Sequence, residues 1–130
     1  MNLLKEKQIG HKTVYYGFSI GAYMLMDLAT KIQLDKIVLV SPSPLFADTI
    51  KIIPEEDRKD FDLTLFDKTL KEMCSMITCE VEVYVGEDEV DSMIKTAHSV
   101  ARELGVLLNV VKGNHTQKMF NEVFSIESGT

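Results

Sequence analysis

The segment 13–23, Thr-Val-Tyr-Tyr-Gly-Phe-Ser-Ile-Gly-Ala-Tyr, constrains the fold of this chain more than any other. It reads as a strand, a tight turn at Ser19 and then a helix, and a glycine stands two residues from Ser19 on each side. A serine on so sharp a turn takes a strained backbone conformation. Its flanking positions must be small because the strand and the helix pass close together. The segment therefore predicts a serine hydroxyl raised above the edge of a sheet.

The rest of the chain alternates short apolar runs with amphipathic helical patterns. The predicted strands cover residues 12–16, 36–40, 80–85 and 106–111, and the predicted helices cover residues 3–9, 21–31, 62–77, 91–104 and 117–124. Residues 45–60 are expected to cross the carboxyl edge of the sheet. Alternating strands and helices favour a parallel sheet with right-handed crossovers. We expect a single α/β domain over residues 1–130, with three α/β/α layers and about four parallel strands.

Bulk composition excludes several classes of function. The 130 residues carry a formal net charge of −6, which argues against nucleic acid or an anionic membrane surface as partner. No apolar run approaches the length of a membrane span, and the first residues lack the apolar core of a signal peptide. Cys74 and Cys79 fit no common zinc or redox spacing. A cytoplasmic protein is therefore expected.

Three of the predicted strands end in residues that could act together. They lead to Ser19, to the acidic loop 86–91 and to His115, and function in a parallel sheet collects at the carboxyl ends of strands. A serine hydroxyl becomes a good nucleophile when a base takes its proton, and histidine suits that task near neutral pH. A carboxylate would orient the imidazole, and the Ile20 N–H at the start of a helix would face a developing oxyanion.

The order serine, acid, histidine resembles the C-terminal half of an α/β-hydrolase. The resemblance rests on Tyr-Gly-Phe-Ser-Ile-Gly-Ala (16–22), Ile-Val-Leu-Val-Ser-Pro (37–42), Val-Tyr-Val-Gly-Glu-Asp (83–88) and Val-Val-Lys-Gly-Asn-His (110–115). It implies a serine hydrolase that acts on an ester or thioester through an acyl-enzyme and needs no cofactor. Residues 42–60 would shape the acyl or leaving-group pocket.

The resemblance leaves the triad acid open among neighbouring carboxylates. In the family, the acid usually stands three residues after the glycine that ends its strand, and Glu89 occupies that position here. We assign Asp88 first, on the assumption of a loop shortened by one residue, with Glu89 as the alternative and Asp91 third. Asp88 could equally be an acid that favours a helix start. No metal site is expected, because the spacing of these acids and His115 is not diagnostic.

The chain also departs from the family. Such enzymes place about four strands before the serine turn, including the loop that donates the second oxyanion N–H. Only the Ile20 N–H is recognisable here, and loss of one oxyanion donor costs about 10²–10³ in rate. The strand before Ser19 would moreover have an unpaired edge. The alternative function is therefore a catalytically impaired remnant that acts as a homodimer or subunit through that edge.

Overall fold

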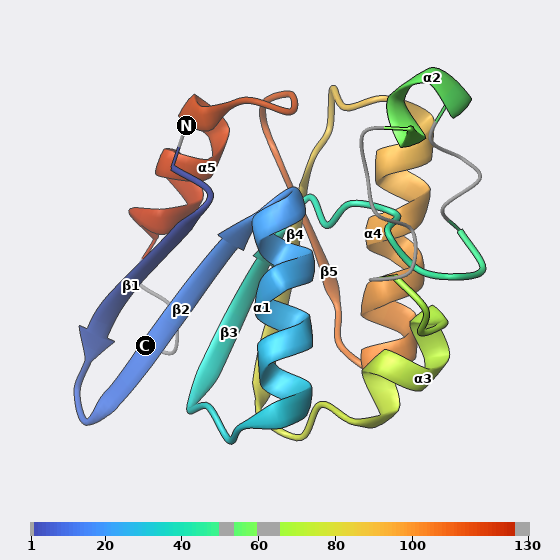
Figure 1. Cartoon of the computed structure of the whole chain (residues 1–130). Helices are drawn as coiled ribbons and strands as arrows, with labels where there is room; N and C mark the ends of the chain where they lie inside the picture. Colours follow the sequence, from blue (N-terminus) through green and yellow to red (C-terminus); the bar gives the residue numbers. More distant parts are fainter. Residues whose placement is uncertain (1, 50–53, 60–65, 127–130) are drawn as a thin grey trace.

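The computed structural model describes residues 2–49, 54–59 and 66–126, in which one sheet carries helices on both faces (Figure 1). The elements are β1 (Leu4–Ile9), β2 (Lys12–Phe18), α1 (Ile20–Lys31), β3 (Lys36–Val40), α2 (Glu55–Arg58), α3 (Leu70–Ser75), β4 (Glu80–Gly86), α4 (Asp91–Leu104), β5 (Leu108–Val111) and α5 (Gln117–Phe124). The sheet order is β1-β2-β3-β4-β5. Strands β2 to β5 are parallel, and β1 runs antiparallel to β2. The predicted α/β class is confirmed.

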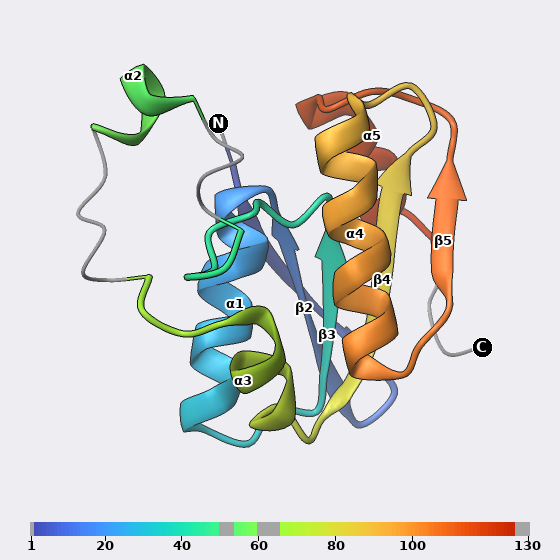
Figure 2. The same ribbon diagram turned by 90° about the vertical axis from the view of Figure 1, so that its right-hand side faces the viewer.

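Two apolar clusters attach the helices to opposite faces of the sheet. One cluster joins α1, α3 and α4 to the sheet, with Met26, Leu39 and Val100 fully buried in it (Figure 2). The other joins α5 to the opposite face, where the Phe120 ring stacks on Phe18 with centroids 5.3 Å apart. Neighbouring residues of a strand point to opposite faces, so the nearly continuous apolar run of β3 supplies both clusters.

Strand register brings the functional loops to one edge of the sheet. Phe18 at the end of β2 pairs with Val40 at the end of β3, and Val40 pairs with Tyr84 near the end of β4. Gly86 at the end of β4 pairs with Val111 at the end of β5. The segments after these four strands therefore leave the same edge side by side, as expected for parallel strands.

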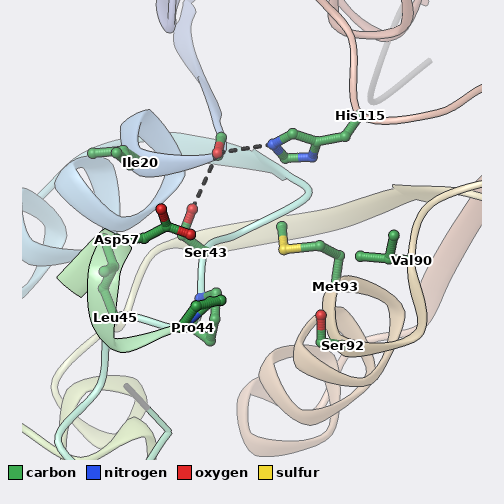
Figure 3. A pocket seen from close by; sticks show the side chains of 11 residues that line it. Ile20, Ser43, Pro44, Leu45, Asp57, Val90, Ser92, Met93 and His115 are labelled. Carbon is green, nitrogen blue, oxygen red and sulfur yellow. Dashed lines mark hydrogen bonds between the residues drawn. The ribbon is translucent and has the colours of Figure 1, made fainter. Parts of the chain in front are cut away.

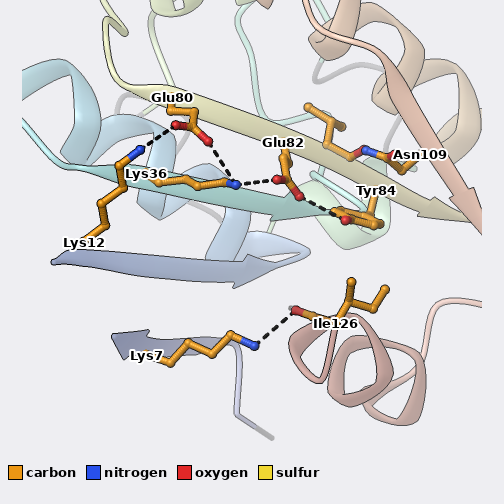
Figure 4. A network of polar contacts seen from close by, with 9 residues as sticks. Lys7, Lys12, Lys36, Glu80, Glu82, Tyr84, Asn109 and Ile126 are labelled. Carbon is orange, nitrogen blue, oxygen red and sulfur yellow. Dashed lines mark hydrogen bonds and ion pairs between the residues drawn. The ribbon is translucent and has the colours of Figure 1, made fainter. Parts of the chain in front are cut away.

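A network of charged side chains begins at the amino ends of β3 and β4, the strand ends opposite that edge (Figure 4). Lys36 is only 2% exposed and pairs with Glu82 and, at 3.0 Å, with Glu80, which also meets Lys12. The Tyr84 hydroxyl donates to Glu82. Burial lowers the pKa of Lys36, but the two carboxylates raise it more, so the pKa lies above its usual value. The network thus satisfies a buried ammonium and takes no part in the edge described above.

The prediction of a helix over residues 3–9 is wrong. Leu4–Ile9 forms β1, which pairs antiparallel with β2 through a two-residue loop, and Gly10 in that loop has a φ of 64°. A helix over the seven residues 3–9 would be marginal in isolation, whereas the strand satisfies the backbone groups of β2. The expectation of an unpaired edge on the strand before Ser19 is therefore wrong as well, because β1 covers it.

Other differences concern where elements begin. Residues 62–65 of the predicted helix 62–77 lie outside the described residues, residues 66–69 are not helical, and α3 covers only Leu70–Ser75. The cause is local, because Thr69 caps α3 and exchanges hydrogen bonds with Glu72 in a capping box. Helices α4 and α5 have the predicted bounds. In the described part of the chain, no helix is both long and apolar enough to cross a membrane.

Candidate active site

Ser19 occupies the corner between β2 and α1 in a conformation that few residues adopt. Its φ is 59° and its ψ is −117°, and its N–H donates to the Val40 carbonyl at the end of β3. A Cβ on Gly17 would lie 2.6 Å from the Gly21 carbonyl oxygen, so glycine is required where the strand passes the helix. The predicted steric cause therefore holds for Gly17, whereas a Cβ on Gly21 would meet the Leu3 carbonyl oxygen at 2.3 Å, outside the strand and helix that the turn joins.

His115 contacts two residues that lie far apart in the sequence, Ser19 and Glu89. Its Nε2 is 2.9 Å from Ser19 Oγ, and its Nδ1 is 2.7 Å from Glu89 Oε1. The ring stands against Phe18, with centroids 4.7 Å apart. Thr116 caps α5 immediately after it, since the Thr116 hydroxyl accepts from the Met119 N–H. Ser19, His115 and Glu89 therefore form one continuous chain of hydrogen bonds.

Glu89 is held in a fully buried socket at the end of β4. Its side chain has no exposed surface, and its Oε2 accepts from the Gly86 N–H at 2.6 Å and from the Ser41 hydroxyl. Burial raises the pKa of the Glu89 carboxyl, but the hydrogen bonds from the imidazole, the hydroxyl and the N–H lower it more. The pKa therefore lies below its usual value, and the group is an anion facing His115 at neutral pH.

The structure places Glu89, and not Asp88, in contact with His115. Asp88 is exposed, and its backbone N–H donates to the Gly113 carbonyl at 3.0 Å. The Glu89 N–H closes a turn on the Gly86 carbonyl, which directs Glu89 back beneath His115. Asp91, the third candidate, begins α4. The carboxylate in contact with His115 is therefore the one that stands three residues after Gly86, and the contact needs no shortened loop.

A cavity of about 310 Å³ opens beside Ser19 (Figure 3). Its lining is mostly apolar and comes from α1, the segment after β3, α2 and α4. The lining residues are Ser19, Ile20, Ser43, Pro44, Leu45, Pro54, Asp57, Val90, Ser92, Met93 and His115. Five described residues of the segment 42–60 are among them, residues 50–53 and 60 lie outside the described residues, and the role as an acyl or leaving-group pocket stays a prediction. An apolar cavity next to a nucleophilic hydroxyl is suited to an uncharged organic group.

The contact between Ser43 and Ser19 was not predicted from the sequence. The Ser43 Oγ is 3.1 Å from Ser19 Oγ, and the Ser43 side chain is almost buried. The sequence carried a signal, because Ser43 stands between two prolines directly after an apolar strand, which is a rigid position at the functional edge. Its contact with Ser19 depends on the pairing of β2 with β3, and so only the fold reveals it.

Within the described residues, no group of three or more histidine, cysteine, aspartate or glutamate side chains is arranged to hold a metal ion. His115 can accept the Ser19 proton at Nε2 while it donates from Nδ1 to the Glu89 carboxylate, and the Ile20 N–H lies at the first position of α1.

No protein-family model matches this chain, and no curated protein matches it by sequence. Among solved structures, an esterase from Pyrococcus furiosus is similar in fold, with a TM-score of 0.50 and 20% sequence identity. The similarity covers 84% of this chain and 48% of the esterase, so this chain spans about half of that protein's length. At this identity the similarity concerns the fold alone, and it agrees with the α/β fold described above.

Proposed function

We propose that this chain is a serine hydrolase in which Ser19 is the nucleophile, His115 the general base and acid, and Glu89 the orienting carboxylate. The observation that carries the proposal is the position of His115, whose two ring nitrogens lie within 2.9 Å of Ser19 Oγ and Glu89 Oε1. Nucleophile, base and orienting group in hydrogen-bond reach of one another are the signature of an activated serine. The fold of the similar esterase is consistent with this proposal.

The proposed reaction begins when Ser19 Oγ attacks the substrate carbonyl carbon and its proton passes to His115 Nε2. The π electron pair of the carbonyl moves to oxygen, and the Ile20 N–H donates to the resulting oxyanion. The Glu89 carboxylate stabilises the imidazolium. The intermediate then collapses, and the bond to the leaving group breaks. The leaving alkoxide or thiolate takes the proton from His115, which leaves an acyl group on Ser19.

Hydrolysis of the acyl-enzyme repeats these steps with water as the nucleophile. Water gives a proton to His115 and its oxygen attacks the acyl carbon. Collapse of the second intermediate returns the electron pair to Ser19 Oγ, which regains its proton from His115, and a carboxylic acid leaves. We propose esters or thioesters with a compact apolar acyl group as substrates. The cavity is small and apolar, and Asp57 is the only acidic residue among its described lining residues.

Labelling with a fluorophosphonate probe tests the proposal. The wild-type chain should react covalently at Ser19, and the Ser19→Ala variant should not react at all. Ser92→Ala is the matched control, because Ser92 lines the same cavity without belonging to the hydrogen-bonded chain. A wild-type chain that is not labelled, under conditions where the fold is intact by circular dichroism, would refute the enzyme.

The other role inferred from the sequence is a dimer or subunit contact through a sheet edge. Because β1 covers β2, such a contact would form on the outer side of β1. The ammonium groups of Lys5 and Lys7 on β1 lie 4.9 Å and 4.7 Å from the centre of the Phe124 ring. Lysines on an edge strand oppose pairing with another strand. These contacts therefore favour the hydrolase over a contact through the sheet edge. The molecular mass measured by size-exclusion chromatography tests for a dimer.

A further inference from the structure

Ser43 lies next to the proposed nucleophile Ser19, and none of the reaction steps described above uses it. It stands in the segment after β3, between Pro42 and Pro44, and its side chain is 7% exposed. Its backbone N–H donates to the Ser19 carbonyl at 3.4 Å, and its Oγ lies 3.1 Å from Ser19 Oγ. The flanking prolines restrict the Ser43 backbone, which holds this residue beside Ser19.

The hydrogen-bond network decides which of the two serines donates. Glu89 is an anion and accepts from His115 Nδ1–H, which leaves Nε2 as an acceptor. Ser19 has one hydroxyl proton, and Nε2 takes it at 2.9 Å. In the Ser19–Ser43 pair the donor is therefore Ser43, whose hydrogen points at the nucleophilic oxygen before the reaction begins.

We propose that the Ser43 hydroxyl is a second oxyanion donor, beside the Ile20 N–H. The inference rests on the proposed hydrolase function, since it requires a tetrahedral intermediate on Ser19. In that intermediate the oxyanion is separated from Ser19 Oγ by a single carbon atom. A hydroxyl already within hydrogen-bond distance of Oγ reaches this oxygen by rotating about its own C–O bond, which hydroxyl groups do freely. No proton is transferred, and Ser43 acts only as a donor.

Other polar side chains of the cavity do not fit this task. Asp57 carries a negative charge, which would repel an oxyanion. Ser92 lies on α4, away from Ser43 (Figure 3). Among the described residues that line the cavity, His115 and Ser43 are the two whose side chains are hydrogen-bonded to Ser19 Oγ. It would provide the second donor that the sequence left unidentified.

An oxyanion donor has a kinetic signature that separates it from a residue that merely holds the nucleophile in place. Ser19 is the nucleophile in acylation, but water is the nucleophile in deacylation. A residue that only orients the free Ser19 hydroxyl for attack therefore slows acylation more than deacylation, because in the acyl-enzyme that oxygen is already bonded to carbon and is the leaving group. An oxyanion forms in both steps, so loss of its donor slows both.

The experiment compares Ser43→Ala and Ser43→Thr with the wild type, using p-nitrophenyl acetate as the probe. Rapid mixing measures acylation from the burst of p-nitrophenolate, and quenching with intact-mass detection measures the decay of the acyl-enzyme. We expect Ser43→Ala to slow both steps by about 100-fold, as for loss of an oxyanion donor, with KM changed less than about twofold. Ser43→Thr keeps the hydroxyl and should stay within about tenfold of the wild type. Ser75→Ala, at an exposed serine on α3 outside the cavity, is the control and should match the wild type.

Ser43→Ala with wild-type rates, or with acylation alone slowed, would overturn this inference. Thermal melting of each variant shows whether the fold is retained, and the Ser43→Thr rates show whether the hydroxyl itself is what matters. The failure of the underlying function is distinguishable. A wild-type chain that a fluorophosphonate does not label at Ser19 refutes the hydrolase, whereas a labelled wild type with a fully active Ser43→Ala refutes only the role of Ser43.

Discussion

Replacing Glu89 by glutamine should stop the proposed reaction while the fold remains intact. The carboxylate accepts hydrogen bonds on both oxygens: Oε1 accepts from His115 Nδ1, and Oε2 accepts from the Gly86 N–H and the Ser41 hydroxyl. Glutamine has one acceptor oxygen and one donor nitrogen. If its oxygen takes the place of Oε2, its amide nitrogen faces His115 Nδ1. The imidazole must then carry its proton on Nε2, so Nε2 can no longer accept the proton of Ser19.

The opposite amide orientation is costly for a different reason. It would place the glutamine nitrogen against two donors, the Gly86 N–H and the Ser41 hydroxyl, in a fully buried socket. An unsatisfied buried donor costs about 1–3 kcal/mol. The first orientation is therefore favoured, and it holds His115 in the wrong tautomer. Loss of the orienting carboxylate of a triad lowers kcat about 10⁴-fold, which is about 5.5 kcal/mol of the activation barrier.

The assay is hydrolysis of p-nitrophenyl acetate, together with the rate of fluorophosphonate labelling. Asp88→Asn is the matched control, because Asp88 is the adjacent carboxylate and is exposed. We expect Asp88→Asn to stay within about twofold of the wild type, as for a surface change with no part in the hydrogen-bonded chain. Glu89→Gln with a rate within tenfold of the wild type, or Asp88→Asn as the slower variant, would refute this reasoning.

The same variant predicts a change in acid stability. The pKa of Glu89 is lower in the folded chain than its ordinary value of 4.5, so the unfolded chain binds more protons as the pH falls below that value. Glu89 therefore stabilises the fold above about pH 4.5, and this contribution is lost as the pH falls through the folded-state pKa. Melting temperatures measured from pH 3 to 6 should converge for wild type and Glu89→Gln at the acid end. Parallel curves would contradict the assignment.

Two further predictions concern the packing of the chain. Gly21→Ala should destabilise the fold by about 1–3 kcal/mol and reduce labelling of the nucleophile, because a Cβ there would lie 2.3 Å from the Leu3 carbonyl oxygen. Gly10→Ala meets no atom within 4 Å but has a positive φ, so denaturant titration should show a loss of stability with normal labelling. Burial raises the pKa of the Cys74 thiol to about 12, so about one molecule in 10⁴ is ionised there at pH 8. Iodoacetamide should therefore modify the half-buried Cys79 first, and mass spectrometry that finds Cys74 modified first would contradict the packing.

Sequence patterns predicted elements whose formation depends on their own residues. The apolar spacing along the inner face of α4 and its C-terminal Gly105, with a φ of 70°, are visible in the helix's own residues and were enough to predict its bounds. The apolar run of β3 likewise indicated a strand buried on both faces. The segment that became β1 gave no such signal. Its alternating charges suit a helix or a strand, and the choice was made by the open edge of β2.

The pattern of residues 13–23 was sufficient to predict that Ser19 turns a corner between a strand and a helix, and the close approach of Gly17 to α1 is the steric reason for a small residue there. The sequence by itself also determined that a histidine and a group of acids follow at the ends of later strands. The tertiary structure alone decided that Glu89, rather than Asp88, meets His115, and that Ser43 meets Ser19. The physical reason is that composition and spacing bring side chains to the same edge. Which oxygen comes within hydrogen-bond distance depends on strand register and on a single loop turn.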